Sequence, residues 1–558
     1  MKPYHTFEEM LGNLAGEENG KDFLFCARTG RSVNYLSFWQ QIRVTAKILK
    51  QYGLKEKARI LLLMDNSIEF AVNYFAIICA GAVAVPVNTH LKWKEIQFIL
   101  EDSGAIGMIA DEKYLELLQE DWPSQEEVRI SQEESRVSQE ESWASQEESR
   151  ASQEEGRASQ EEKGGSWKDS WKDLQKGVVF LKTGGRPQEK EAAAGTADDI
   201  PDGTVMILYT SGTTGHPKGV MLSCENLLSK AEDIKEAHQL TREDCVLCVL
   251  PWFHINGLVI TLITPLYTGH RIVIGGKFSV TNFWKDLETY QATWFSGVPT
   301  MYSHMLARGI PESGRHSSLR FARSASSPLP AAVLEEFEAN CHVPIIESYG
   351  ITEGCAQITT NPLPPAEQKV GSVGLPYGNR IRITGIDGAE LPAGKKGEVW
   401  IQGLNITCGY YHRTEENKKS FTENWFHSGD LGCLDADGYL YLEGRIKELI
   451  NRAGEKFSPV EVDEVLYQLP EVELAATAGV YDAVYGEKTA SFLKLKEGCR
   501  LTKQQVTEWC RNRIASYKVP DKVYFVEDIP KGGNGKIQRL KLVDIYNNMS
   551  EQDKENKA

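Results

Sequence analysis

A short loop, Thr210 to Gly219, combines glycines, hydroxyl groups and an ammonium directly after an apolar run. Glycines allow the backbone to approach a ligand closely, and hydroxyl and ammonium groups donate hydrogen bonds to phosphate oxygens. No Gly-Lys-Ser/Thr sequence closes the loop, which argues against a P-loop NTPase. The alternative is a plain Gly/Thr-rich surface turn. We therefore predict a polyphosphate cradle formed by Thr210, Ser211, Gly212, Thr213, Thr214, Gly215 and Lys218.

A second segment, Glu347 to Glu353, brings an aromatic ring, a hydroxyl and a carboxylate close together. The ring of Tyr349 suits stacking on adenine, and the hydroxyl of Thr352 suits donation to an α-phosphate. Glu353 offers the oxygen ligand that Mg²⁺ prefers, so we expect it to hold the metal. The alternative is a helix N-terminus at which Thr352 or Glu353 only caps the backbone.

Three further charged residues fit a nucleotide site. Asp430 follows Ser428-Gly429 in a turn, where a carboxylate suits the two ribose hydroxyls or simply forms the turn. Arg445 adds a cation near the nucleotide. Lys536 lies in a glycine-rich loop that could carry its ammonium into a cleft; the alternative is an exposed lysine with no specific role.

The loop around Thr210 resembles the signature loop of the adenylate-forming superfamily, which contains acyl-CoA synthetases, amino-acid adenylation domains and luciferases. Further matches follow in the superfamily's order over nearly the whole chain: Glu347 to Glu353, Trp425 to Asp430, Gly444 to Ile450, Gly454 to Lys456 and Gly535-Lys536. This resemblance implies the nucleotide-binding roles given above, with ATP and Mg²⁺ as cofactors and CoA as co-substrate.

The resemblance also implies roles in two half-reactions. Lys536 is expected to stabilise charge while the adenylate forms, although Gly532 to Asn534 departs from the Thr and Ser residues that relatives often carry there. Lys447 stands at the superfamily's hinge, about which the C-terminal domain rotates between the half-reactions. Gly454 is expected to line the tunnel for the pantetheine arm of CoA.

The acid pocket is expected at Phe253, His254, Gly297 and Ser324. Amino-acid adenylation domains usually place an Asp near the position of His254, and none occurs here, so the resemblance favours a free carboxylic acid. The alternative for His254 is a core histidine. The chain most resembles oxalate, short-chain and fatty acyl-CoA ligases, yet Asn256 and Ala356 stand where oxalate ligases carry histidines. An acid with an apolar tail is therefore at least as well supported as oxalate.

The predicted function is that of an ATP-dependent acyl-CoA ligase, which makes acyl-AMP, transfers the acyl group to CoA and releases AMP and pyrophosphate. One alternative is an acyl-AMP ligase that loads a carrier protein. Another is a non-catalytic nucleotide-binding scaffold. The expected partners are a small carboxylic acid, ATP and CoA, with no nucleic acid.

The elements that must position these residues alternate between short β-rich runs and helical periodicity, which indicates an α/β fold with a parallel sheet. We predict a large N-terminal domain of several subdomains over residues 1–445 and a small, mobile α+β domain over residues 446–558. Residues 124–195 form an acidic low-complexity insertion within the first domain. It opens with six heptads that contain 12 glutamates and only five basic residues. Too few heptad positions are apolar for a coiled coil, so we expect a solvated segment without catalytic residues.

Composition limits the remaining classes of protein. The chain has 558 residues, a formal charge of -16 and a pI near 5.4, which argues against a general nucleic-acid binder. Eleven cysteines in a chain of this length fit a reducing compartment, so we expect a cytoplasmic location. The longest apolar stretch, Phe70 to Val87, contains polar, glycine and proline interruptions, which favours a core helix followed by a strand over a membrane span. A homo-oligomer is compatible with this composition.

Overall fold

The computed structural model describes residues 4–18, 20–117, 127–129, 178–182, 200–210, 217–315, 318–532 and 535–548. The chain forms two compact units. Residues 1–24 and 32–219 form the first unit, and residues 25–31 and 220–558 form the second. The chain passes between the units in the segment that joins β1 (Asp22–Cys26) to β2 (Arg31–Asn34). The predicted boundary near residue 446 does not coincide with this division and stays a prediction.

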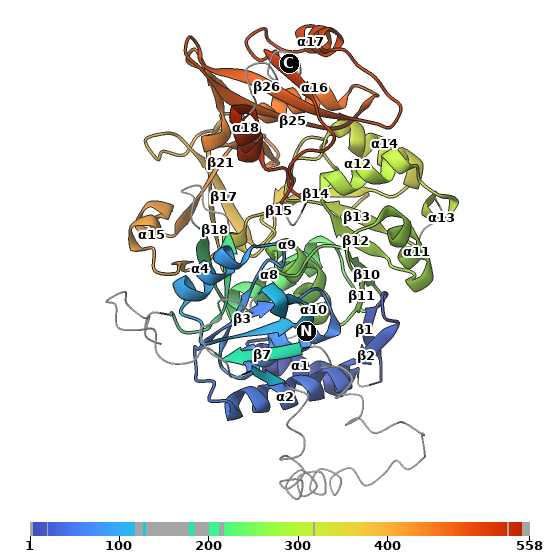
Figure 1. Cartoon of the computed structure of the whole chain (residues 1–558), viewed down its shortest axis with the longest axis vertical. Coiled ribbons are helices and arrows are strands. Elements are labelled where there is room, and N and C mark those ends of the chain that lie inside the picture. The colour runs from blue at the N-terminus through green and yellow to red at the C-terminus, as the bar shows by residue number, and fades with distance from the viewer. Residues whose placement is uncertain are drawn as a thin grey trace, which may run out of the picture. The chain divides into compact units, whose positions relative to one another are not determined.

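The first unit is built on a mixed sheet covered by helices (Figure 1). Its strands lie in the order β8 (Thr204–Thr210), β4 (Val83–Pro86), β3 (Arg59–Leu63), β5 (Gly107–Asp111), β7 (Val178–Lys182) and β6 (Glu127–Arg129). The first four strands are parallel, and β7 and β6 extend the sheet as an antiparallel pair. The helices are α1 (Phe7–Glu17), α2 (Tyr35–Gln51), α3 (Ile68–Cys79), α4 (Trp93–Ser103) and the 3-10 helix η1 (Glu112–Leu117).

The stretch Phe70 to Val87 forms most of α3 and then β4, as the sequence predicted. The described helices include none that is long and apolar enough to span a membrane.

The main sheet of the second unit carries two of the four residues expected in the acid pocket, Gly297 and Ser324. Its strands lie in the order β16 (Leu375–Pro376), β15 (Thr359–Thr360), β14 (Ile345–Tyr349), β13 (Phe321–Ser324), β12 (Trp294–Gly297), β10 (Cys245–Cys248) and β11 (Arg271–Ile274). Strands β10 to β14 are parallel, so their carboxyl ends lie at one edge. Ligands of α/β proteins bind at this edge as a rule.

Helices and short strands surround this sheet. They are β9 (Lys218–Ser223), α8 (Cys224–Ala237), α9 (Ile255–Leu258), the π-helix η3 (Val259–Ile263), α10 (Thr264–Thr268), α11 (Val280–Tyr290), α12 (Pro299–Arg308), α13 (Glu312–Arg315), α14 (Ala331–Cys341), the 3-10 helix η4 (Thr352–Gly354), β19 (Gly409–Tyr410) and α15 (Thr414–Ser420). Side chains from α11, α12 and α14 form an apolar core against one face of the sheet.

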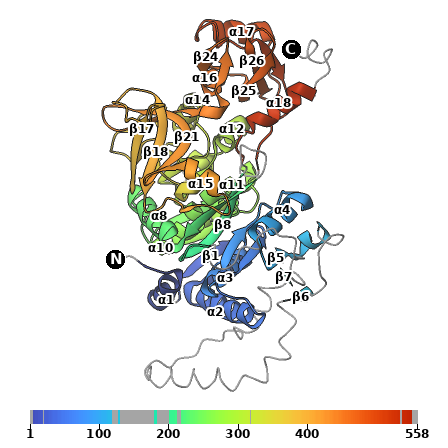
Figure 2. The same cartoon turned by 90° about the vertical axis from the view of Figure 1, so that its left-hand side faces the viewer.

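Two antiparallel sheets complete the second unit. One joins β17 (Asn379–Thr384), β18 (Gly397–Gly403), β21 (Trp425–Leu434), β20 (Phe421–Thr422) and β22 (Leu440–Arg445). After the 3-10 helix η5 (Ile446–Glu448), the other joins β24 (Glu455–Phe457), β23 (Ile450–Arg452), β26 (Gly486–Leu495), β25 (Val472–Asp482) and β27 (Lys522–Phe525). Figure 2 shows this last sheet with its helices α16 (Pro459–Tyr467), α17 (Lys503–Arg511) and α18 (Arg539–Asn548). It has two apolar clusters of its own, one toward α16 and α17 and one toward α18.

The two described pieces of the acidic insertion are strands. Glu127–Arg129 and Val178–Lys182 pair with each other, and the second piece also pairs with β5. The pairing register sets Arg129 opposite Val179, so residues 130–177 are framed by two neighbouring antiparallel strands. The insertion thus begins and ends at adjacent points on the sheet.

We predict that residues 130–177 can be replaced by a four-residue glycine-containing turn, because antiparallel neighbours are commonly joined by loops of about two to five residues. The shortened protein should unfold within a few degrees of the full chain and keep ATP-dependent pyrophosphate release within a few-fold, since loop length costs little. A matched deletion that also removes Glu127–Arg129 should be less stable, because it exposes the edge of β7. A loss of roughly 10² in rate in a folded four-residue variant, the size expected for a missing catalytic group, would place the insertion in the active site.

Candidate functional site

Strand β14 delivers the Tyr349 segment at the carboxyl edge of the main sheet. The next residue must be glycine, because a Cβ on Gly350 would lie 1.1 Å from the carbonyl oxygen of Ala356. The chain then forms η4, in which Thr352 and Glu353 occupy a single 3-10 turn and do not cap a longer helix. The amide of Asn405 donates to the carbonyl of Gly354 at 2.7 Å and helps to fix the turn.

Asp430 is the centre of the polar contacts around Tyr349. The Tyr349 hydroxyl donates to Oδ2 of Asp430 at 2.5 Å, and Nε of Arg445 lies 2.7 Å from Oδ1. Asp430 and Arg445 are direct partners across β21 and β22. Ser428 fixes the turn before Asp430, since its Oγ donates to the Val399 carbonyl and accepts from the Asp430 amide. The structure therefore brings Tyr349, Asp430 and Arg445 into direct contact.

Burial dominates the electrostatics of this contact. Asp430 is 6 % exposed, and the loss of water raises its pKa, while Arg445, Tyr349 and Lys536 act in the opposite direction. The same carboxylate raises the pKa of Arg445. A carboxylate has about four lone-pair sites, so both oxygens of Asp430 can still accept hydrogen bonds from a ligand.

Glu353 lies beside this group and has a carboxylate oxygen available. The Tyr410 hydroxyl donates to its Oε1 at 2.8 Å, and its backbone carbonyl accepts from the amide of Thr407 at 2.7 Å. Among the described residues Oε2 has no hydrogen-bond donor. Mg²⁺ is commonly held by one or two carboxylates together with substrate phosphates, so Glu353 fits the predicted metal ligand.

Lys536 belongs to the same electrostatic group. Loss of surrounding water lowers its pKa, and Arg445 adds to this, whereas Glu448 and Asp430 oppose it. The residue as a whole is exposed, so the protein atoms crowd its ammonium without enclosing the side chain. The carbonyl of Gly535 accepts from Oγ1 of Thr300 at 3.2 Å, which holds the loop against α12.

The predicted acid pocket is brought together only in part. Phe253 and His254 are adjacent at the start of α9, and their ring centroids lie 5.0 Å apart. Gly297 and Ser324 are partners at the ends of β12 and β13. A Cβ on Gly297 would lie 3.3 Å from the rings of Phe295 and Tyr302, so this position faces the apolar core.

The other predicted residues lie on separate elements. Lys447 is in η5, and Gly454 is in the turn between β23 and β24 with φ +94°, a conformation that favours glycine. Thr210 ends β8 and Lys218 begins β9, both in the first unit. The residues between them that we expect in the phosphate cradle, Ser211 to Gly215, lie outside the described residues.

Sequence reasoning missed three residues of the second unit that the structure makes prominent. Tyr410 contacts Glu353, Glu347 is buried in β14, and Arg323 is buried in β13. An arginine inside the apolar run Phe321–Ser324 is a detectable signal, because arginine is seldom fully buried without a partner. No local pattern marks Tyr410.

Glu347→Gln is predicted to become more stable than the wild type as the pH rises. Burial raises the pKa of Glu347 from 4.5 to about 8, so the native state keeps a proton that the unfolded state releases. This stabilisation is complete below about pH 4.5 and is lost as the pH rises through about 8, whereas glutamine does not titrate. The gap in Tm between the variant and the wild type should widen over this window in thermal unfolding. A constant gap between about pH 5 and pH 9 would contradict the protonated state.

Comparisons with known proteins agree with this geometry. Residues 14–411 match the model of the AMP-binding enzyme family, and residues 461–536 match that of the AMP-binding enzyme C-terminal domain. The chain is 35% identical over 509 residues to an oxalate–CoA ligase of Arabidopsis thaliana, covering 89% of this chain and 90% of the relative. It is 39% identical over 358 residues to a sulfoacetate–CoA ligase of Cupriavidus necator, covering 64% and 70%.

Solved structures agree over almost the full length. An anthranilate CoA ligase in complex with anthranoyl-AMP superposes with a TM-score of 0.78 at 26% identity, covering 98% of both chains. ATP-bound MatB from Rhodopseudomonas palustris gives a TM-score of 0.77 at 26% identity, covering 97% of this chain and 99% of that one. The predicted superfamily and fold class are thereby confirmed. The chain belongs to the AMP-binding enzyme family of the adenylate-forming superfamily.

Proposed function

We propose that the chain activates a carboxylic acid at the Tyr349–Asp430–Arg445 group and completes the reaction by transfer to CoA. The activity is that of an ATP-dependent acid–thiol ligase with ATP, Mg²⁺ and CoA, as the sequence predicted. The contact of Tyr349 and Arg445 with the buried Asp430 is the observation that supports the site most directly. The close approach of an aromatic ring, a carboxylate and a guanidinium supports the proposal of a nucleoside site here.

In the first half-reaction an oxygen of the acid attacks the α-phosphorus of ATP, and pyrophosphate leaves. We assign the adenine platform to Tyr349, the ribose contacts to Asp430 and the α-phosphate contact to Thr352. Glu353 would hold Mg²⁺, which supplies positive charge to the polyphosphate when it is bound. Arg445 and Lys536 add fixed positive charge, and charge that is already positioned stabilises a transition state without reorganisation.

In the second half-reaction the CoA thiolate attacks the acyl carbon of acyl-AMP, and AMP leaves. We propose that residues 446–558 act as a mobile domain that turns at Lys447 and presents Gly454 to the pantetheine arm. Their own sheet and their two separate apolar clusters support this, because such a body can move without losing its core. Few polar contacts fasten it to the preceding chain in the described residues, among them His304 to Glu473 at 2.8 Å.

The acid is expected to enter beside Phe253 and His254.

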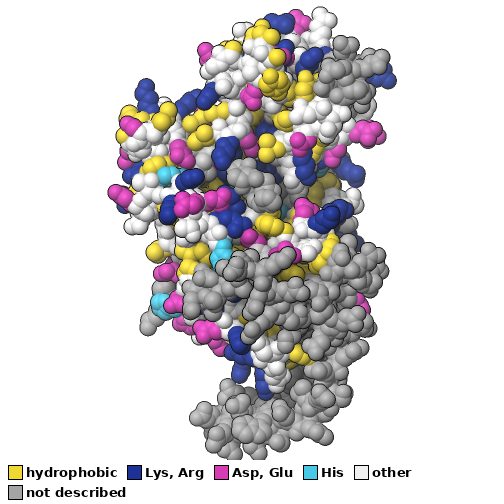
Figure 3. All heavy atoms as spheres, turned by 60° about the vertical axis from the view of Figure 1, so that its left-hand side comes forward, with side chains coloured by type: hydrophobic (Ala, Val, Ile, Leu, Met, Phe, Trp, Pro, Cys, Tyr) yellow, Lys and Arg dark blue, Asp and Glu magenta, His cyan; other side chains and the backbone are white. Residues whose placement is uncertain are grey.

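A cytoplasmic location is also part of the proposal. No disulfide joins any of the eleven cysteines, which fits a reducing compartment. A homo-oligomer stays a prediction. Acidic and basic side chains are interspersed over the described surface in view in Figure 3.

Lys536→Ala is predicted to separate the half-reactions. The loss of one positioned charge typically costs about 10² to 10³ in rate, so pyrophosphate release from acid and ATP should fall by about that factor. Supplied with presynthesised acyl-AMP, the variant should form acyl-CoA at a nearly normal rate. Rapid-quench assays of each half-reaction measure both quantities.

Lys531→Ala is the matched control for Lys536→Ala. Lys531 lies in the same loop but pairs with Asp528 at 2.6 Å, so its removal should leave pyrophosphate release within a few-fold. Equal loss of both half-reactions in folded Lys536→Ala would show that this lysine does not act in adenylation alone. Thioester formation only with a carrier protein, and none with CoA, would reject CoA as the acceptor.

A further inference from the structure

Arg323 is a fully buried cation whose hydrogen-bond partners are all neutral. It lies in β13 with 0 % of its surface exposed. Its Nη1 donates to Oδ1 of Asn256 at 2.9 Å and to Oγ of Ser296 at 3.0 Å, and its Nε donates to Oε1 of Gln357 at 3.3 Å. Within the described chain no carboxylate pairs with it.

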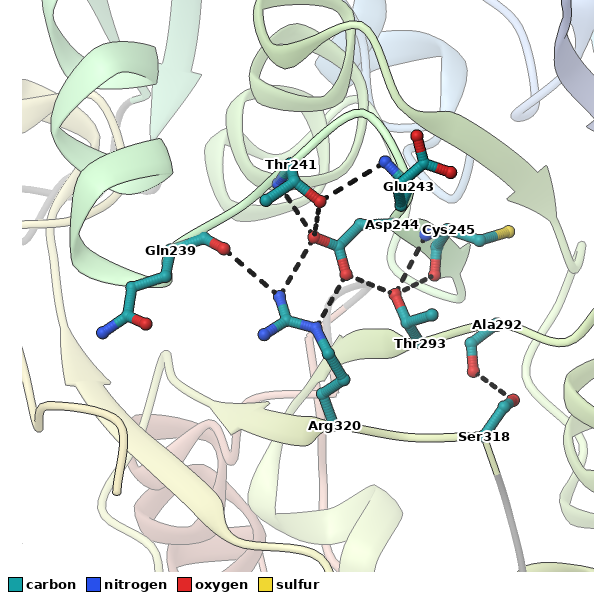
Figure 4. Close-up of polar contacts among 9 residues, drawn as sticks. All are labelled: Gln239, Thr241, Glu243, Asp244, Cys245, Ala292, Thr293, Ser318 and Arg320. Atoms are coloured by element: carbon teal, nitrogen blue, oxygen red, sulfur yellow. Dashed lines mark hydrogen bonds and ion pairs between the residues drawn. The ribbon is translucent and has the colours of Figure 1, made fainter. Parts of the chain in front are cut away.

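Two other arginines of this chain, which we take as structural, each pair with a carboxylate. Figure 4 shows Arg320, three residues before Arg323, whose Nε and Nη2 lie 2.8 and 3.0 Å from the two oxygens of Asp244. Arg539 likewise lies 2.6 Å from Asp463. Removing a charge from water without a counter-charge is costly, and a single buried cation is rarely kept without use.

The charge of Arg323 persists at neutral pH. Burial lowers the pKa of its guanidinium to about 9, which still leaves it protonated near pH 7. The neighbouring His238, 3.0 Å from Gln357, supplies no compensation, since burial and Arg323 lower its pKa to about 3 and keep it neutral. The positive charge of Arg323 can therefore attract an anionic ligand that binds next to Asn256, Ser296 or Gln357.

Asn256 links the buried guanidinium of Arg323 to the carboxyl edge of the sheet. Because Oδ1 of Asn256 accepts from Arg323, its amide nitrogen must point the other way, and it donates to Oγ of Ser326 at 3.1 Å. Arg323 is fully buried, whereas Asn256 and Ser326 are partly exposed. Asn256 is the second residue of α9, which follows β10, and Ser326 follows β13, so both lie beyond the carboxyl ends of parallel strands. Asn256 offers an amide N–H and Ser326 a hydroxyl to a ligand, and the guanidinium of Arg323 lies on the buried side of Asn256.

We propose that Arg323, acting through Asn256 and Ser326, selects carboxylic acids that carry a second anionic group. The inference rests on the proposed ligase function. One carboxylate reacts with ATP, and the second acidic group accepts hydrogen bonds from Asn256 and Ser326 while it compensates the charge of Arg323. Arg323 thus acts as a positioning residue: it orients the Asn256 amide and supplies the electrostatic attraction.

The test compares acids of equal carbon number on the full-length enzyme, with malonate against propionate and succinate against butyrate. The ratio of kcat/KM, diacid over monoacid, should exceed about tenfold for the better pair in the wild type. Arg323→Met, which keeps the volume but removes the charge, should lower that ratio roughly ten- to hundredfold, as expected for loss of a charge-assisted contact. The change should appear mainly as a higher KM for the diacid.

Two further variants keep the inference falsifiable if Arg323→Met folds poorly. Asn256→Asp sets a carboxylate beside Nη1, so it should raise Tm by pairing the buried charge and should also lower the diacid-to-monoacid ratio. Arg320→Met is the matched control: it breaks a paired arginine on the same segment, so it should lower Tm and leave the ratio unchanged.

A wild-type ratio near or below one for both pairs would overturn the inference while leaving the ligase function intact. A folded Arg323→Met that slows diacids and monoacids equally would also overturn it and assign Arg323 a purely structural role. Failure of every acid in a broad panel to release pyrophosphate from ATP would reject the ligase function itself, and the inference with it.

Discussion

The ion pair between Asp430 and Arg445 is the contact on which the rest of the nucleotide site depends. Asp430 is buried and its pKa is raised by that burial, so its charge needs the guanidinium beside it. The pair is set by the strand register of β21 and β22, and the hydroxyl of Tyr349 joins it from the main sheet. The need to pair the buried charge of Asp430 therefore holds β14, β21 and β22 together. Because Arg445 ends β22 directly before η5, the same pair also anchors the chain where the C-terminal segment begins.

Much of the architecture could be predicted from local pattern. Short apolar runs between helical segments correctly indicated an α/β fold with parallel strands. The apolar stretch that ends at Val87 was correctly divided into helix and strand because Gly81 and Pro86 interrupt it. Helices and strands of this kind depend on residues that are neighbours in the sequence, so they can be predicted from the sequence alone. The two strands of the acidic insertion escaped prediction because β6 has only three residues and pairs with a strand far away in the sequence.

The candidate site was predictable in its residue types and less so in its contacts. Tyr349, Glu353, Asp430, Arg445 and Lys536 form one electrostatic group in the structure, and the hydrogen bond of Tyr349 to Asp430 joins residues 81 positions apart. Gly297 shows the limit of pattern, since sequence cannot tell which face of β12 it occupies, and the structure turns it toward Phe295 and Tyr302. Arg323 shows the same limit with the opposite result: its lack of a carboxylate partner becomes visible only when the surroundings of β13 are known. From the sequence, an acid with an apolar tail was at least as well supported as oxalate, because the missing histidines are visible there and the lone buried charge of Arg323 is not.

The antiparallel pairing of β6 with β7 has a consequence for how this gene can change. Adjacent strands lie about 4.8 Å apart, so the chain enters and leaves residues 130–177 at a separation that does not depend on the length of that segment. Each heptad corresponds to a block of codons that can be duplicated or lost in frame when a repetitive template slips during replication. A change in the number of heptads therefore leaves the pairing of the two strands that frame residues 130–177 unaltered.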